Sequence, residues 1–342
     1  MKFAFISRLL FGLVLCFSLY ALDYAKPLET GKKKFATIGF YNVENLFDTI
    51  DDPLKKDNEF TPDSAKGWNS YRYSQKIEKL SEVISSMGSS PGPAVIGLCE
   101  VENIDVLRDL AANAQLSKGK YEPILIEGPD QRGIDVALLY SKKQFKPISS
   151  DSYSIDLGAE ERPTRDILHV RGKLKGGPMI HIFVNHWPSR YGGQEKSEPK
   201  RIAAAKVLAT KTDSIHRMYP DEEIICMGDF NDYPDNRSLT EFLPTGEADL
   251  LVNLMTGLKE TKRGSYNYRG DWDFLDQLIV SRSLTDGELP DIVRGSTAPF
   301  FTDSMVYTHP KYGDIKPKRT YGGPEYFGGY SDHLPVYTIL AY

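Results

Sequence analysis

The sequence predicts an α/β domain built in layers, in which helices cover β-sheets, and three observations support this fold class. First, short apolar runs typical of β-strands recur along the chain, at residues 35–41, 94–99, 134–140, 167–173, 179–185, 223–227, 274–280 and 334–340. Second, three stretches between these runs have apolar residues at helical spacing. Third, no Ser/Gly-rich linker, low-complexity block or internal repeat divides the chain, which favours a single domain.

Two long helices and one short helix are predicted. Residues 71–87 place five apolar side chains on one face: Ile77, Leu80, Val83, Ile84 and Met87. Residues 195–218 are rich in alanine and carry three further apolar side chains, Ile202, Val207 and Leu208. The short helix follows Asn103 and has an apolar face formed by Val106, Leu107 and Leu110. The pattern leaves open whether the sheets are parallel.

The N-terminus resembles a targeting segment. Lys2 and Arg8 supply a positive region, residues 9–20 are almost continuously apolar, and a small residue at 21 or 25 can end the segment. We therefore expect a cleaved signal peptide over residues 1–25, a short polar linker over 26–34 and the functional domain over 35–342. An uncleaved anchor is the alternative, although the apolar run is short for a membrane span. The expected location of the mature chain is secreted or periplasmic.

Composition limits how the protein can meet a charged substrate. The formal net charge is −5 and the pI is about 5.8. A protein that holds nucleic acid by bulk charge is usually basic, so any phosphate-bearing substrate must be bound by a local site. The two cysteines outside the N-terminal segment, Cys99 and Cys226, lie in apolar runs and are interpreted as core residues, with a disulfide as the alternative.

Residues 301–330 form a Gly- and Pro-rich tract that predicts a long ordered loop. Its aromatic rings, at Tyr312, Tyr321, Tyr326, Phe327 and Tyr330, suit the stacking of nucleobases. Its cations, Lys311, Lys316, Lys318 and Arg319, suit contacts with a phosphate backbone. The equally weighted alternative is that the rings pack the loop onto the domain.

Polar residues recur where the predicted strands end. Acids, amides and histidines end or interrupt six apolar runs: Asn42, Glu44, Glu100, Asn185, His186, Asp229, Asn231, Asp276, Asp332 and His333. Any one of them alone can serve as a turn cap. A carboxylate at the rim of an apolar strand is costly to bury unless it is paired or binds a metal. Together they predict an oxygen-rich site for Mg²⁺ or Mn²⁺, the ions suited to phosphoryl chemistry, and Ca²⁺ is a further option.

Six motifs in this order resemble those of the endonuclease/exonuclease/phosphatase superfamily. They are residues 41–47 (YNVENLF), 97–102 (GLCEVE), 185–188 (NHWP), 228–231 (GDFN), 275–276 (LD) and 331–336 (SDHLPV). The resemblance spans the chain from about residue 35 to the end. It implies a four-layered αββα sandwich, with two packed mixed sheets flanked by helices and the active site at one edge of the sheets.

The resemblance also implies which residues hold the metal. Glu100 matches the acid that holds the catalytic cation, with Asn42, Glu44 and Asp332 beside it. Asp229 matches the carboxylate that orients or deprotonates the attacking water, and Asn231 matches the amide that supports the phosphate.

Two histidines and a further acid complete the implied catalytic set. His186 matches the histidine of the pancreatic-type deoxyribonuclease branch that protonates the leaving oxygen. His333 matches the histidine that contacts the phosphate, and Asp276 matches the carboxylate that orients it. A neighbouring anion raises a histidine pKa and favours a cation at the phosphate.

Four arginines and one amide are the predicted substrate contacts. Arg132, Arg162, Arg165 and Arg190 carry the bidentate donors that suit phosphate, and an ordinary ion pair is the alternative for each. Asn185 belongs to the same predicted set.

The predicted function is therefore a secreted metal-dependent endonuclease acting on DNA, with RNA as a second polymer. Residues 226–232 and 272–277 differ from the motifs of inositol polyphosphate phosphatases, which tells against those substrates. Hydrolysis of phosphomonoesters, or sphingomyelinase-like hydrolysis of phospholipids, is the alternative. A catalytically dead binding module is opposed by the complete set of competent motif residues. We expect a monomer without a stable protein partner and without a membrane span in the mature chain.

Overall fold

Two large mixed sheets lie face to face in the computed structural model, which describes residues 32–246, 249–261, 264–311 and 313–342. The sheet built around the first strand, called sheet A, has seven strands: β13 (Asp291–Ile292), β19 (Val336–Ala341), β1 (Phe35–Leu46), β2 (Val95–Val101), β4 (Asp135–Ser141) and β3 (Tyr121–Leu125) in that order, with β14 (Ala298–Pro299) also paired to β19. Only β1 and β2 pair in parallel in sheet A.

Sheet B has six strands. Their order is β5 (Phe145–Tyr153), β6 (Ile167–Leu174), β7 (Met179–His186), β8 (Glu223–Asp229), β12 (Asp276–Ser281) and β9 (Leu251–Asn253). Its one parallel pair is β7 with β8. The central strands are apolar on both faces because both faces are covered, which is why they appear in the sequence as unbroken apolar runs.

The main core fills the space between the two sheets. Phe40 and Leu138 of sheet A and Ile182, Met227 and Leu278 of sheet B are fully buried in one cluster. Burying a side chain of this size contributes roughly 1.5–3 kcal/mol.

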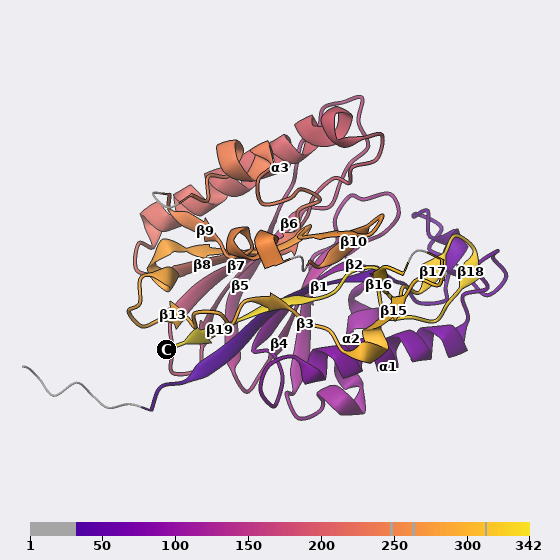
Figure 1. Ribbon diagram of the computed structural model, residues 1–342, viewed down its shortest axis with the longest axis horizontal. Helices are drawn as coiled ribbons and strands as arrows, with labels where there is room; N and C mark the ends of the chain where they lie inside the picture. Colours follow the sequence, from indigo (N-terminus) through magenta and orange to yellow (C-terminus); the bar gives the residue numbers. More distant parts are fainter. Residues whose placement is uncertain (1–31, 247–248, 262–263, 312) are drawn as a thin grey trace, which may run out of the picture. The chain divides into compact units, whose positions relative to one another are not determined.

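Three helices cover the outer faces. α1 (Ser70–Ser86) and α2 (Ile104–Ala112) pack on sheet A, where Leu80 and Leu107 join Leu98 of β2 in a second cluster. α3 (Gln194–Met218) packs on sheet B, where Leu208 contacts the cluster that holds Phe183. Figure 1 shows α3 on one side of the paired sheets and α1 and α2 on the other. This confirms the predicted layered α/β class, with the order helix, sheet, sheet, helix.

Eight predicted strands and three predicted helices are present, and the differences lie at the edges. Edge strands β3 and β5 were not predicted because Pro123 interrupts the first and exposed polar residues 149–151 interrupt the second. Cys99 and Cys226 are buried free thiols in different clusters, as the core interpretation expects.

The tract 301–330 was predicted as a loop, and the structure divides it into short hairpins. β15 (Val306–Thr308) pairs with β16 (Ile315–Pro317), and β17 (Tyr321–Gly322) pairs with β18 (Glu325–Tyr326). A similar hairpin joins β10 (Tyr266–Tyr268) and β11 (Asp271–Asp273). Short helical turns occupy Asn58–Phe60, Ala114–Leu116, Ser238–Phe242, Thr256–Thr261, Arg282–Thr285 and Asp303–Met305.

A buried ammonium anchors this tract to α1. The Lys76 side chain, 2% exposed, donates hydrogen bonds to Thr320 Oγ1 at 2.6 Å and to the Tyr330 carbonyl at 2.7 Å. Burial lowers its pKa to about 8, against the opposing effect of the carboxylates of Glu44 and Asp332. The C-terminal tract is thereby held beside the strand ends that carry the predicted site.

The predicted signal peptide, residues 1–25, lies outside the described residues, and so does Tyr312. Among the residues that are described, no helix has both the length and the apolar character of a membrane span.

Candidate active site

One edge of sheet B carries three predicted site residues in a single row. The strand register pairs His186 of β7 with Asp229 of β8, and Asp229 with Asp276 of β12. Neighbouring strands in a sheet lie about 4.8 Å apart, so this register places the three side chains within reach of one another. The row exists because β7 ends at His186, β8 ends at Asp229 and β12 begins with Asp276.

The matching edge of sheet A is irregular. The β1–β2 register shifts between Asn42 and Leu46, and the β2–β4 register shifts at Glu100. Glu44, Asn45 and Glu100 have positive φ angles of 51°, 56° and 63°, a conformation that non-glycine residues seldom adopt. Such strain is typical of functional sites, where it aims a side chain that regular strand geometry would direct elsewhere.

The two edges meet at Asn42 and Asp229. The Asn42 amide donates to Asp229 Oδ2 at 3.1 Å and lies 3.5 Å from Glu100 Oε1. Its own carbonyl oxygen accepts the backbone N–H of Glu44, and Ser331 Oγ donates to the Asn42 backbone carbonyl. Residues from four of the six motifs are therefore in direct contact.

Three carboxylates line a cavity of about 210 Å³ beside this contact. They belong to Glu44, Glu100 and Asp332, and Arg132 and Arg319 lie on the same wall. Burial, and next the negative charge of Asp332, raise the pKa of Glu44. Like charges that converge in a partly buried site favour a bound cation, and the oxygen-only donor set fits Mg²⁺ or Mn²⁺. Asn42, Glu44, Glu100 and Asp332 are thus suited to hold the metal.

A second group, Asp229, Asp276 and His333, brings ligand-type atoms within 4.8 Å of one another. His333 Nδ1 forms a 2.6 Å hydrogen bond with Asp276 Oδ2, and its Nε2 lies 3.9 Å from Asp229 Oδ2. Burial alone would lower the pKa of His333, but Asp276 and Asp229 outweigh burial and raise it well above the usual value. A protonated imidazole has no lone pair for a metal, so this group is better suited to contact a phosphate.

His186 has the opposite electrostatic environment. Its side chain is 4% exposed, and Nε2 lies 3.7 Å from Asp229 Oδ2 and 4.0 Å from Glu100 Oε1. Burial lowers the pKa of His186 well below the usual value, and Arg165 and Arg132 lower it further. The imidazole is therefore neutral at neutral pH, and its role as proton donor to the leaving oxygen stays a prediction.

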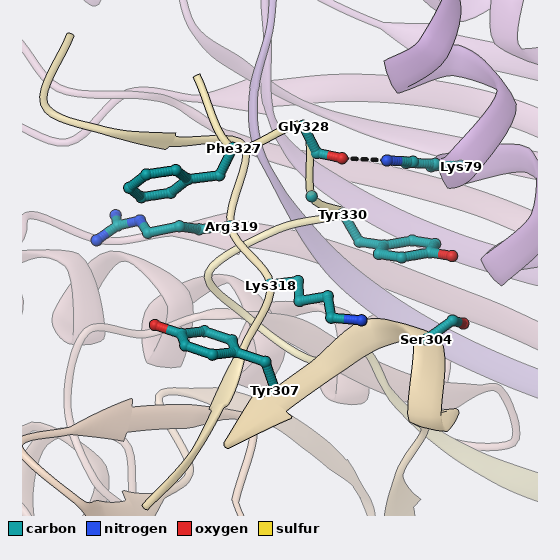
Figure 2. A pocket seen from close by; sticks show the side chains of 9 residues that line it. Lys79, Ser304, Tyr307, Lys318, Arg319, Phe327, Gly328 and Tyr330 are labelled. Carbon is teal, nitrogen blue, oxygen red and sulfur yellow. Dashed lines mark hydrogen bonds between the residues drawn. The ribbon is translucent and has the colours of Figure 1, made fainter. Parts of the chain in front are cut away.

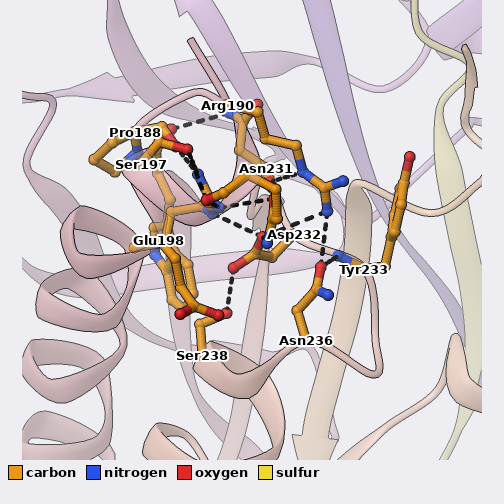
Figure 3. Close-up of polar contacts among 12 residues, drawn as sticks. Pro188, Arg190, Ser197, Glu198, Asn231, Asp232, Tyr233, Asn236 and Ser238 are labelled. Carbon is orange, nitrogen blue, oxygen red and sulfur yellow. Dashed lines mark hydrogen bonds and ion pairs between the residues drawn. The ribbon is translucent and has the colours of Figure 1, made fainter. Parts of the chain in front are cut away.

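Asn231 is held by a buried network, drawn in Figure 3. Its φ is 50°, its amide donates to the Trp187 carbonyl at 3.0 Å, and its backbone carbonyl accepts from Arg190 Nε at 2.8 Å. Arg190 also reaches Asp232, which forms a 2.7 Å ion pair with Arg201, both side chains being 0% exposed. Arg190 thus contacts the protein's own groups in this structure, and the predicted phosphate contact stays a prediction.

The sequence as a whole matches one family. Residues 37–342 match the endonuclease/exonuclease/phosphatase family. The chain belongs to that family. A search of curated protein sequences finds no match.

Solved structures agree at the level of the fold. A family protein from Bacteroides thetaiotaomicron is 16% identical with a TM-score of 0.57, the match covering 91% of this chain and 96% of that one. A mannosyl-6-phosphatase from the same species is 17% identical, TM-score 0.56, covering 90% and 100%. Danio rerio TDP2, complexed with a single-strand DNA product, is 14% identical, TM-score 0.52, covering 90% and 99%.

Family membership confirms the predicted enzyme class. Members of the endonuclease/exonuclease/phosphatase family are divalent-metal-dependent phosphoester hydrolases. The carboxylates of Glu44, Glu100 and Asp332 described above supply a place for such a metal.

The remaining residues that were predicted to contact the substrate differ in how deeply they are buried. Arg165 is buried, donates to the Trp187 carbonyl at 2.8 Å and pairs with Asp130 at 3.3 Å. The Arg132 side chain is 51% exposed on the wall of the carboxylate cavity, and Arg162 is exposed. Asn185 is fully buried, where it donates to the Met227 carbonyl and accepts from the Trp187 indole. Asn185 therefore orients the strand end beneath His186.

Sequence reasoning missed the residues that support the site from behind. Asp232 and Arg201 form the buried pair, and Thr320 donates its backbone N–H to the Glu44 carboxylate. Arg319, predicted from the sequence as a contact for a phosphate backbone, lies 2.9 Å from Asp332 and 3.5 Å from Glu44 in this structure. The only sequence signal was the position of Asp232 next to Asn231, and nothing in the chain marked its partner on α3.

Proposed function

We propose that the chain is an exported Mg²⁺- or Mn²⁺-dependent phosphodiesterase that cuts DNA. The observation that carries this proposal is the convergence of Glu100, Asp229, His186 and the His333–Asp276 pair on one rim, beside a cavity lined with carboxylates. Export is supported by the N-terminal charge and apolar run alone.

The metal, held by Glu100 with Asn42, Glu44 and Asp332, would neutralise charge that develops on the phosphate oxygens. Burial raises the pKa of Asp229, which makes its carboxylate a better proton acceptor for the attacking water. Cationic His333, oriented by Asp276, donates a hydrogen bond to a phosphate oxygen, and the Asn231 amide acts on the same group. His186, whose Nε2 lies 3.7 Å from Asp229 Oδ2, would lie beside the leaving oxygen.

The choice of DNA is supported by the similarity to TDP2, which is complexed with a single-strand DNA product, and by exposed aromatic rings and cations near the rim. A second candidate is phosphomonoester hydrolysis, which the mannosyl-6-phosphatase similarity favours. Both reactions use the same carboxylates and histidines and differ only in what surrounds the phosphate.

A substrate panel separates these candidates. Residues 26–342 would be incubated with plasmid DNA, single-stranded DNA, RNA, sphingomyelin and p-nitrophenyl phosphate, each with Mg²⁺, Mn²⁺ or EDTA. Glu100→Gln serves as the control for contaminating enzymes. EDTA-sensitive cleavage of DNA that the variant lacks supports the proposal. Hydrolysis of the monoester or the lipid without cleavage of DNA would rule out a nuclease but would still support a phosphoesterase.

A further inference from the structure

A cavity of about 490 Å³ lies next to the carboxylate cavity and has no part in the chemistry described above. Its walls come from α1 and from the tract 301–330, and Figure 2 shows the side chains that line it. We call it the aromatic–basic pocket, after its three cations, Lys79, Lys318 and Arg319, and its three rings, Tyr307, Phe327 and Tyr330.

Two of the three cations, Lys79 and Lys318, are not matched by acids, whereas Arg319 pairs with Asp332 and Glu44. No carboxylate lines the pocket, and among the described residues none forms an ion pair with Lys79 or Lys318. The Lys79 ammonium donates to the Gly328 carbonyl and lies 5.4 Å from the Tyr330 ring centre. Partial burial lowers the pKa of Lys79, Glu82 opposes this, and the charge of Lys318 lowers it further. Two ammonium groups that repel each other beside a cavity are arranged to receive an anion.

The rings of the pocket differ in exposure. Tyr330 is 8% exposed and forms part of the wall, whereas Phe327 is 55% exposed and Tyr307 is 37% exposed. In Figure 2 the Arg319 side chain extends between the rings of Phe327 and Tyr307. Exposed rings beside cations are the features with which proteins bind single-stranded nucleic acid, because every base has a face that can stack.

Glycines give the pocket its shape. A side chain at Gly329 would place its Cβ 2.0 Å from the Lys318 carbonyl oxygen, and one at Gly322 would place it 2.4 Å from the Phe327 ring. The segments that carry Lys318 and Phe327 approach this closely only because these two positions lack a Cβ. The cations and rings are thus held in place by backbone packing.

Arg319 connects the pocket with the catalytic rim, by which we mean the carboxylate cavity and the neighbouring residues His186, Asp229, Asp276 and His333. Arg319 lines both cavities, and its guanidinium lies 2.9 Å from Asp332 Oδ2. A ligand in the pocket would therefore adjoin a phosphate held at the metal-binding carboxylates.

We propose that the aromatic–basic pocket binds the nucleotide next to the scissile phosphate, with its base stacked on the exposed ring of Phe327 and its phosphate between Lys79 and Lys318. This inference rests on the proposed function for the identity of the substrate. A paired base in a duplex has both faces covered by its neighbours, so the pocket selects single-stranded or frayed DNA.

Binding measured apart from cleavage tests the pocket. Fluorescein-labelled oligo(dT) and a labelled duplex are titrated into residues 26–342 carrying Glu100→Gln, and anisotropy gives the dissociation constants. Adding Phe327→Leu should weaken binding of the single strand about tenfold, whereas Phe327→Trp should retain it. Adding Lys318→Gln should weaken binding and reduce the slope of log K against log salt by about 0.7, the value for one phosphate contact on a single strand. Lys146→Gln, the same charge change on exposed strand β5, is the matched control and should change neither.

Equal affinities of the parent, Phe327→Leu and Lys318→Gln for oligo(dT) would overturn the proposal, and so would equal affinity for the duplex and the single strand. Cleavage by the chain with Glu100 intact is scored separately. Loss of binding in the pocket variants, combined with no cleavage of any DNA, would support the pocket and reject DNA as the hydrolysed substrate. If the pocket variants cleave and bind DNA as well as the parent, the proposal for the pocket is wrong and the proposed nuclease activity stands.

Discussion

The catalytic rim and the aromatic–basic pocket adjoin through Arg319, yet their charges are arranged in opposite ways. In the rim, polar and ionisable groups pair across different segments of the chain, as His333 pairs with Asp276 and Asp229 pairs with Asn42. In the pocket, Lys79 and Lys318 lie near each other without an acid in its lining. The rim is built on strand ends of two packed sheets, and the pocket on hairpins and turns. From this difference we infer that the sheets fix the reaction, and we propose that the C-terminal tract selects the substrate.

Glu100→Gln should give the largest effect on the rim. The amide keeps the shape of a side chain that accepts the Asn45 N–H at 3.0 Å but removes the negative charge from the metal site. We expect hydrolysis of every substrate to fall at least about 10³-fold, with little change in melting temperature, since electrostatic stabilisation is usually the largest catalytic contribution. Isothermal titration with Mn²⁺ checks the loss of metal binding directly. Wild-type rates in the variant would show that the metal is held elsewhere.

Asp276→Asn should have the next largest effect and should change the pH profile. Asp276 raises the pKa of His333, so the imidazole remains protonated at neutral pH and loses its proton only as pH rises through that raised pKa. The variant should be about 10²–10⁴-fold slower at pH 8, and the alkaline fall in its rate should begin at lower pH. The stability that this pair contributes is fully present below about pH 6.5, the usual pKa of histidine, and is lost as pH rises through the raised pKa of His333. Rate profiles from pH 5 to 9 measure the shift, and an unchanged alkaline limb would contradict the assigned role.

Asp232→Asn tests a residue that supports the rim from behind without taking part in the reaction. It leaves the Arg201 guanidinium, 0% exposed, without its counter-charge, which typically costs about 3–5 kcal/mol. We expect lower stability in urea unfolding and a slower reaction, because Arg190 loses one of the contacts that fix the Asn231 carbonyl. Oligonucleotide affinity should be unchanged in the folded protein, because Asp232 has no contact with the pocket. Unaltered unfolding would mean that the pair is not needed for stability.

Gly329→Ala should have the smallest effect on the rim and a selective effect on the pocket. Its Cβ would clash with the Lys318 backbone and displace the segment that carries the cation. We expect oligo(dT) binding to weaken several-fold and stability to fall by about 1–3 kcal/mol, as for other overpacked positions. Anisotropy and thermal unfolding test this. Gly295→Ala is the control for loss of a glycine, because a Cβ at this position would meet no other atom. The φ of Gly295 is 77°, so this variant carries the greater backbone strain but has no clash.

Much of the rim was predictable because the central strands are buried on both faces. Their apolar runs made the strand ends visible, so Glu100, His186, Asp229 and Asp276 stood out as polar residues at the rim. The order of the motifs supplied the layered fold. These residues could be selected without knowing which strands pair or whether the paired strands are parallel.

Other parts of the site left no signal in the sequence. The register shifts at Asn42–Leu46 and Glu100 involve no glycine, so the positive φ angles of Glu44 and Glu100 could not be anticipated. The aromatic residues of the tract 301–330 divide between packing and exposure. Tyr321 is 7% exposed within an aromatic cluster, while Phe327 is 55% exposed, a difference that depends on tertiary contacts.

Reversible metal dependence shows whether the carboxylates of Glu44, Glu100 and Asp332 hold a catalytic metal. End-labelled single-stranded DNA would be incubated with residues 26–342 after dialysis against EDTA, and then again after addition of Mg²⁺ or Mn²⁺ in excess. We expect no cleavage without the metal and full recovery with it in the wild-type chain, and no recovery in Glu100→Gln. Cleavage that persists in EDTA, or that Glu100→Gln retains after the metal is restored, would contradict a metal centre at these carboxylates.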